Sequence, residues 1–99
     1  MNNQKVSNLL GLAQRAGKII SGEEMVVKAI QDRKVKLVFL AHDASPNLTK
    51  KIQDKSHYYQ VEVITVFSTL ELSIAVGKSR KVLAVTDAGF TKKMRSLME

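Results

Sequence analysis

Two hydrophobic periodicities alternate along this chain, and the alternation constrains the fold more than any other feature. Segments with apolar residues at helical spacing are separated by short runs that are rich in β-branched residues. These runs are expected to form strands at residues 18–21, 35–41, 61–67 and 82–86. The 35–41 run is almost entirely apolar, which is typical of a central strand that is covered on both faces.

Helices are expected before, between and after these strands. The first is expected to end near residue 17, the second to cover about 22–33, the third to begin at 45, the fourth to cover 68–76 and the last to begin at 87. Ser45 is a favourable N-cap, and Pro46 suits a first helical turn. Ser68 and Glu71 form a capping box, and Asp87 caps the last helix. The chain therefore reads as helices alternating with strands.

This order predicts the fold class. Strands separated by helices require crossover connections, so an α/β fold is expected, with a mostly parallel or mixed sheet and helices on both faces. A length of 99 residues predicts a single domain over residues 1–99.

Composition excludes several classes of function. The chain has no cysteine, which excludes disulfide scaffolds, thiolate catalysis and cysteine-ligated metals. Two histidines leave little for another transition-metal site, so no cofactor or metal is expected. No apolar stretch approaches the ~20 residues that span a bilayer, and no signal peptide is evident, so a cytoplasmic location without membrane contact is expected. The net charge of +7 favours a polyanionic partner, nucleic acid before a membrane surface.

Candidate catalytic residues are few. Asp43 and Asp87 each follow an apolar strand, where open α/β sheets place ligands, so they could bind magnesium or act as acid and base. Helix capping is the simpler interpretation of both. His42 is adjacent to Asp43 and is expected to point the other way. Glycine-rich phosphate loops and nucleophile elbows are absent, so no catalytic residues and no enzymatic activity are predicted.

Basic residues gather next to the expected turns. Arg15 and Lys18 form a first group, residues 33–36 a second and residues 77–81 a third. The first and third are expected to share one edge of the sheet. Lys28 lies one turn into the second helix, whose N-terminus exposes backbone donors. Together these features favour a grip on a phosphate backbone, and a solvated charged rim is the alternative.

A motif after the second expected strand resembles a known signature. Residues 41–46, Ala-His-Asp-Ala-Ser-Pro, resemble the A-x-D-A-x-P pattern of the L-seven-Ae / L-thirty-e family of kink-turn RNA-binding ribosomal proteins. Residues 22–30 are similar to that family's G-x-x-x-x-x-K-A motif. Residues 72–77 match its L-G-x-A-x-G pattern in part, and residues 87–90 are similar to its close. The opening stretch at 10–18 is similar to the bacterial YlxQ-type branch.

This resemblance implies a fold, a partner and a site. The fold would be a three-layer α/β/α sandwich around a mixed four-stranded sheet. The partner would be ribosomal or another structured RNA, bound without a cofactor by a monomer that could also contact ribosomal or other proteins. Together with Lys18 from the first basic group, the expected RNA-binding residues are Gly22, Glu23, Glu24, Met25, Lys28, Asp43, Pro46, Gly77, Lys78, Ser79, Arg80 and Lys81.

The chain departs from the family pattern at the expected site. Glu24 and Met25 stand where typical kink-turn binders carry Asn and Glu, and Ser73 replaces a glycine. The predicted function is non-catalytic binding of a structured RNA, kink-turn-like or a related ribosomal element, through phosphate contacts and an inserted basic loop. The alternative is a protein-interaction module on the same fold, which the apolar residues Met25 and Val76 would suit.

Overall fold

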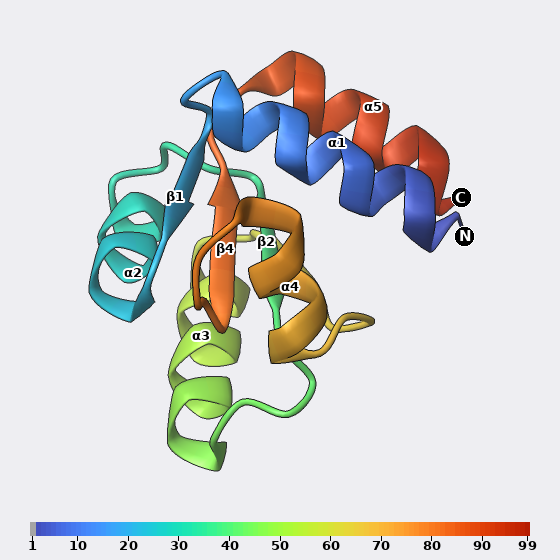
Figure 1. Ribbon diagram of the computed structural model, residues 1–99. Coiled ribbons are helices and arrows are strands. Elements are labelled where there is room, and N and C mark those ends of the chain that lie inside the picture. The colour runs from blue at the N-terminus through green and yellow to red at the C-terminus, as the bar shows by residue number, and fades with distance from the viewer. Residues whose placement is uncertain (1) are drawn as a thin grey trace.

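Helices and strands alternate along the whole of the computed structural model, which describes residues 2–99 (Figure 1). The elements are α1 (Asn3–Arg15), β1 (Ile19–Ser21), α2 (Glu23–Gln31), β2 (Leu37–Leu40), α3 (Pro46–Tyr58), β3 (Glu62–Ile64), α4 (Thr69–Val76), β4 (Val82–Val85) and α5 (Ala88–Met98). The predicted order of elements and the α/β class are confirmed.

The four strands form one mixed sheet in the order β1-β4-β2-β3. Strand β4 runs antiparallel to both β1 and β2, whereas β2 and β3 are parallel. The central strands β2 and β4 are buried at every position, as the apolar run at 35–41 predicts.

The strands are shorter than their apolar runs. Strand β3 covers three residues instead of the expected 61–67. Among the described residues 2–99 it pairs with β2 alone, at Leu37 to Phe39. Residue type predicts where a strand can form, but its length depends on how far a neighbouring strand offers hydrogen bonds. An edge strand with one neighbour therefore ends early.

Helices cover both faces of the sheet, which confirms the three-layer sandwich. Helices α2 and α3 pack on one face around Val38 and Leu40, with Ile52 among their buried residues. Helices α1, α4 and α5 pack on the other face around Leu37 and Phe39. Alternate residues of β2 thus point into different cores.

The predicted helix caps are confirmed. The Ser45 hydroxyl accepts the Leu48 N–H at 3.2 Å, and Asp87 accepts the Phe90 N–H at 2.9 Å. Ser68 and Glu71 make both bonds of the capping box. These bonds engage Asp87 as a structural residue.

The two ends of the sheet differ from the sequence-based expectation. Because β1 and β4 are antiparallel, Ser21 pairs with Leu83 at one end and Ile19 with Val85 at the other. The 77–81 segment therefore precedes β4 at the first end, whereas Lys18 lies beside Thr86 at the second, where its carbonyl accepts the Thr86 N–H at 3.0 Å. The expectation that these basic groups share an edge is wrong. We call the first end the loop end and the second the distal end.

Candidate functional site

A groove at the loop end is bordered by three segments that are distant in sequence. They are the N-terminus of α2, the N-terminus of α3 and residues 77–81, which we call the basic loop. The groove has a volume of about 420 Å³. Its lining residues are Ser21, Gly22, Glu23, Ser45, Leu48, Ser79, Arg80, Lys81 and Val82.

The N-terminus of α2 presents backbone donors to this groove. Gly22 is the N-cap, with φ of 93°, a conformation that favours glycine and that turns the chain from β1 into α2. Its own N–H donates to the Val82 carbonyl at 3.2 Å. Since Gly22 has no side chain to cap the helix, the N–H groups of the first turn stay available to a ligand.

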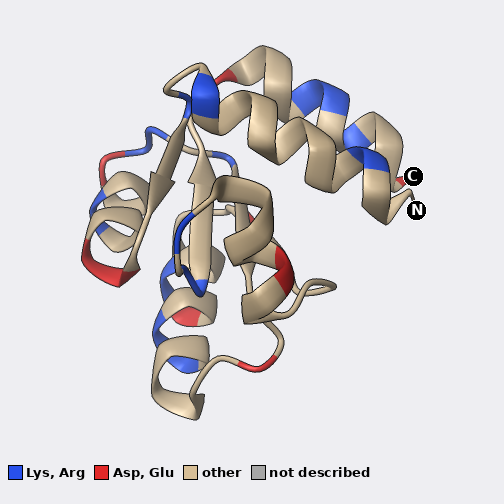
Figure 2. Cartoon of the chain, viewed as in Figure 1, with Lys and Arg blue, Asp and Glu red and all other residues tan. Residues whose placement is uncertain are grey.

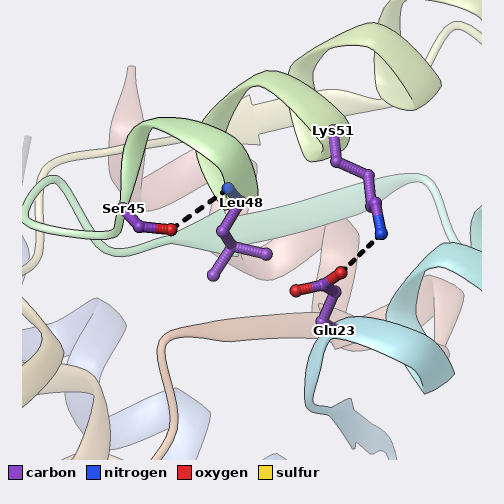
Figure 3. Close-up of polar contacts among 4 residues, drawn as sticks. All are labelled: Glu23, Ser45, Leu48 and Lys51. Atoms are coloured by element: carbon purple, nitrogen blue, oxygen red, sulfur yellow. Dashed lines mark hydrogen bonds and ion pairs between the residues drawn. The ribbon is translucent and has the colours of Figure 1, made fainter.

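An ion pair connects the start of α2 with the second turn of α3. Lys51 Nζ lies 2.6 Å from Glu23 Oε2, and Figure 3 shows this pair beside the Ser45 cap. The hydrogen bond from Lys51 to Glu23 raises the pKa of Lys51. The carboxylate of Glu23 is therefore balanced by a cation, which lowers its repulsion of an anion in the groove.

Arg80 is the best-anchored residue of the basic loop. Its backbone N–H donates to the Ser73 hydroxyl at 3.0 Å, and that hydroxyl donates to the Arg80 carbonyl at 3.3 Å. Its side chain donates from Nε to Ser21 Oγ at 2.8 Å and from Nη1 to the Ser79 carbonyl at 2.7 Å. The loop is thus fixed at Arg80, while Lys78 and Lys81 are exposed.

The end of α4 explains how the loop begins. Gly77 adopts a left-handed conformation with φ of 77° at the C-cap, as its place after the helix predicts. The Gly77 N–H donates to the Ser73 carbonyl at 2.8 Å. The chain can therefore reverse immediately and enter β4.

Other predicted site residues of α2 lie beside the groove, on the exposed side of the helix. Glu24 and Met25 are exposed in its first turn, with 58% of Met25 accessible. Lys28 lies one turn further along α2 and lines a neighbouring hollow with Glu24 and Lys51. Glu24, Met25 and Lys28 thus lie on the exposed surface of α2, outside the lining of the groove itself.

Asp43 has a structural partner. Its Oδ1 accepts the N–H and the hydroxyl of Thr69, at 2.9 and 2.7 Å, and thus holds the loop after β2 against the start of α4. These hydrogen bonds, led by that from the Thr69 hydroxyl, lower the pKa of Asp43. Pro46, by contrast, is exposed in the first turn of α3, next to the groove residue Ser45.

Two expected interface residues lie elsewhere. Lys18 is at the distal end of the sheet, because β1 runs from that end toward the groove. Val76 is 7% accessible and packs in the core, so it offers no apolar surface to a partner protein. The position of Val76 next to the loop in the sequence did not predict that its side chain points into the core.

Three supporting residues are not evident from the sequence pattern. Ser21 and Ser73 hold Arg80, and Leu48 lines the groove. The sequence did mark Ser73 as unusual, since it replaces a glycine of the family pattern. Nothing in the sequence pointed to Ser21, because its bond to Arg80 spans 59 positions of sequence.

Two common structural features are absent from the described residues. Residues 2–99 contain no cluster of three or more His, Cys, Asp or Glu side chains placed to hold a metal ion. Within the same range, no helix has the length and apolarity needed to cross a membrane.

Comparison with known proteins shows close relatives. RNA-binding protein YlxQ of Enterococcus faecium is 50% identical over 98 residues, covering 99% of this chain and 95% of the relative. RNA-binding protein YlxQ of Bacillus subtilis is 49% identical over 92 residues and covers 92% of both chains. These matches confirm the resemblance to the YlxQ-type branch.

The fold has solved counterparts as well. The structure of the Giardia lamblia 15.5kD RNA binding protein superposes with a TM-score of 0.84 at 17% identity, covering 96% of this chain and 82% of that one. A family model, that of the Ribosomal protein L7Ae/L30e/S12e/Gadd45 family, matches residues 4–95. The match spans all of the sheet and the groove, and the chain belongs to the Ribosomal protein L7Ae/L30e/S12e/Gadd45 family.

Proposed function

We propose that this protein binds structured RNA, a kink-turn or a related ribosomal element, in the loop-end groove and catalyses no reaction. The observation that carries the proposal is the convergence of two helix N-termini and the basic loop on one groove. The family, the names of the YlxQ relatives and the net charge of +7 support RNA as the ligand.

Phosphate groups would be held by backbone and side-chain donors together. The free N–H groups at the start of α2 suit a phosphate, and Lys81 adds charge from the opposite wall, with the exposed Lys78 in the same loop. Arg80 Nη2 has no hydrogen-bond partner among residues 2–99, so it is available for a phosphate or a guanine edge. Ser21 and Ser79 hold the guanidinium in place for that contact.

The first turn of α2 would contribute to base recognition. The Glu24 carboxylate can accept hydrogen bonds from a base amino group, and Met25 can make apolar contact with a base. Neither reproduces the Asn and Glu of typical kink-turn binders, so the bound element is proposed as a kink-turn or a related fold of RNA. Lys28 would hold the backbone that continues along α2.

Binding and its salt dependence test this proposal. We expect the Lys28→Ala, Lys78→Ala and Lys81→Ala triple variant to bind a kink-turn RNA more weakly than wild type. Its slope of log affinity against log salt should fall by about 0.7–0.9 for each phosphate that the variant no longer neutralises. The matched control, Lys5→Ala, Lys50→Ala and Lys93→Ala, removes the same charge from helix surfaces outside the groove. If both variants bind alike, the groove is not the site.

A protein-interaction module is the second candidate function. Its support is the outer face of α4, where Leu70 and Ile74 are 69% and 71% accessible. A partner held by such apolar contacts would bind with little dependence on salt, whereas RNA binding through phosphates weakens steeply as salt rises. The two functions are therefore separated by isolating the complex that this protein forms in cells and measuring its dissociation as the salt concentration rises.

A further inference from the structure

A second groove lies at the distal end of the sheet, away from the proposed RNA site. It has a volume of about 790 Å³ and is bordered by the segment before β2 and by one side of α5. Its cationic lining residues are Arg33, Lys34, Lys36, Lys92 and Arg95. We call it the distal groove. Figure 2 shows Lys and Arg both in the loop before β2 and along α5.

The sheet builds the floor of this groove. Leu37 pairs with Val85, which places Lys36 next to Thr86 on the adjoining strand. Lys18 lies on the other side of Thr86, whose hydroxyl donates to the Lys18 carbonyl at 3.1 Å. Basic residues from two turns that are distant in sequence therefore flank the end of β4.

Helix α5 is attached to the other wall of the groove. Arg95 donates from Nε to Glu62 at 2.9 Å and from Nη2 to the Lys36 carbonyl at 3.1 Å. On the wall before β2, the Arg33 guanidinium stacks over Tyr59, 5.2 Å from the ring centroid. Both arginines are thus held by the protein and define the shape of the groove.

The lysines of the distal groove remain free to bind a ligand. Lys34, Lys36 and Lys92 are exposed, and none of them forms an ion pair with another residue in the 2–99 range. Two acidic residues, Asp87 and Glu99, also line the groove, and Asp87 accepts the Phe90 N–H as the cap of α5. The five cationic side chains outnumber the two acidic ones, so the lining carries a positive potential that attracts anions.

The lining favours a nucleic-acid backbone over an acidic protein. Protein interfaces depend on large apolar or aromatic anchors at their centre. The large exposed apolar side chains of residues 2–99 are Leu12, Met25, Tyr58, Val66, Leu70 and Ile74, and none lines the distal groove. Spaced lysines without such anchors suit phosphates, which position a nucleic acid without reading its sequence.

We propose that the distal groove is a second RNA-binding site, which holds the phosphate backbone of a helical RNA segment. The inference rests on the proposed function, since it assigns a second segment of RNA to the protein. The grooves lie at opposite ends of β4, so one molecule can hold two RNA segments at once. The distal contacts are to backbone and therefore do not depend on sequence.

A two-step binding experiment tests the second site. A kink-turn RNA is immobilised and saturated with protein, and a labelled A-form RNA duplex without a kink-turn is then added. Wild type should capture the duplex, and the Lys34→Ala, Lys36→Ala and Lys92→Ala variant should capture it at least about tenfold more weakly. Its salt slope for the duplex should fall by roughly 2–3, the value for three phosphates that are no longer neutralised.

The variant with Lys5→Ala, Lys50→Ala and Lys93→Ala is a matched control here too. Lys93 is the neighbour of Lys92, but it lines a different hollow with Leu9 on the other side of α5. This variant should capture the duplex as wild type does. Thermal melting of both variants checks that each is folded.

The outcomes separate the inference from the proposed function. Normal binding to the immobilised RNA with unchanged duplex capture by the distal variant overturns the second site and leaves the first intact. If wild type does not bind the immobilised kink-turn RNA, the kink-turn is excluded as the ligand of the first groove. Direct titration of the free protein and of the same variants with the duplex then tests the second site. Polyglutamate is a polyanion without phosphate groups. If polyglutamate binds in place of the duplex, and this binding requires the lysines of the distal groove, the assignment of the groove to RNA is overturned.

Discussion

Ser73 shows how a residue outside the lining of the groove can support the proposed RNA site. Its hydroxyl bonds both the N–H and the carbonyl of Arg80, so it fixes the backbone from which the guanidinium extends. A glycine at this position of α4 could do neither. In this chain, the serine that replaces the glycine of the family pattern therefore occurs together with a basic loop, and it holds the backbone of Arg80 in that loop.

We expect Ser73→Ala to weaken both the fold and the binding of RNA. The Arg80 N–H would be left without its partner at a part-buried position, which should lower the free energy of unfolding by about 1–2 kcal/mol. Urea denaturation measures this decrease. Ser7→Ala is the matched control, because Ser7 is also a half-buried helical serine. Equal stability of the two variants would show that the Ser73 hydroxyl contributes nothing.

Asp43 makes stability depend on pH. Hydrogen bonds from Thr69 lower the pKa of Asp43 in the folded protein, so folding favours the ionised carboxylate. This contribution is fully present above the unfolded pKa, near 3.9, and is lost as pH falls through the lower folded pKa. We therefore expect Asp43→Ala to destabilise the protein at pH 7 and to do so less as the pH approaches 3.

Chemical denaturation at several pH values measures the Asp43 effect. Asp54→Ala is a suitable control, since Asp54 forms an exposed ion pair with Lys50 one helical turn away. A difference between Asp43→Ala and wild type that stays constant from pH 7 to 3 would contradict a role for the carboxylate charge. Binding of RNA by Asp43→Ala at pH 7 tests separately whether the residue also contacts RNA.

Local contacts at the residue scale could be predicted from the sequence, whereas distant ones could not. Ser45, Ser68 and Asp87 cap helices through bonds to residues three positions away, and this spacing is visible in the sequence. The bond from Arg80 to Ser21 depends on the pairing of β1 with β4. No local pattern encodes that contact.

At the scale of elements, the kinds of segment were predictable and their directions were not. Alternating periodicities reveal helices and strands because each depends on nearby residues. The antiparallel pairing of β1 with β4 depends on which strand ends meet, and it places Lys18 at the distal end. Together with the pairing of β2 with β4, it brings Lys18 and Lys36 to either side of Thr86, beside the distal groove.

The first turn of α2 provides a prediction about RNA specificity. Restoring the residues of typical kink-turn binders, with Glu24→Asn and Met25→Glu together, should strengthen binding to a standard kink-turn by about 1–3 kcal/mol, the value of a well-placed base contact by analogy with base recognition in DNA. The two changes act together, because both side chains project from the same exposed turn.

Two RNAs and one control variant sharpen this test. Affinity is measured for a kink-turn and for a duplex of equal length, and the gain should be confined to the kink-turn. The double variant keeps the net charge of this turn, because it moves one carboxylate from position 24 to position 25. Glu24→Asn alone removes one negative charge without supplying the carboxylate at 25, so it measures the effect of charge by itself. A gain of the same size on both RNAs would show that the change does not act through recognition of the kink-turn.

At the scale of the whole molecule, the central strands connect the two helical layers. Residues of β2 alternate between the core beneath α1, α4 and α5 and the core beneath α2 and α3. Each groove is bordered by elements from more than one part of the chain, so its geometry depends on the sheet that positions them. Disruption of either core should therefore affect both grooves.

The expectation of a single domain can be tested through β2. Leu37 and Leu40 lie on this strand and are 0% and 1% accessible, but they point into different cores. We expect Leu37→Ala and Leu40→Ala each to cost about 2–5 kcal/mol of stability, because each leaves a cavity in a close-packed core. Since the cores share β2 and β4, each variant should unfold in one transition involving both faces.

Methyl NMR signals from Leu10 and Ile52 report on the two cores during guanidinium denaturation. Coincident curves are expected, whereas a variant in which one core melts first would show that the layers fold independently.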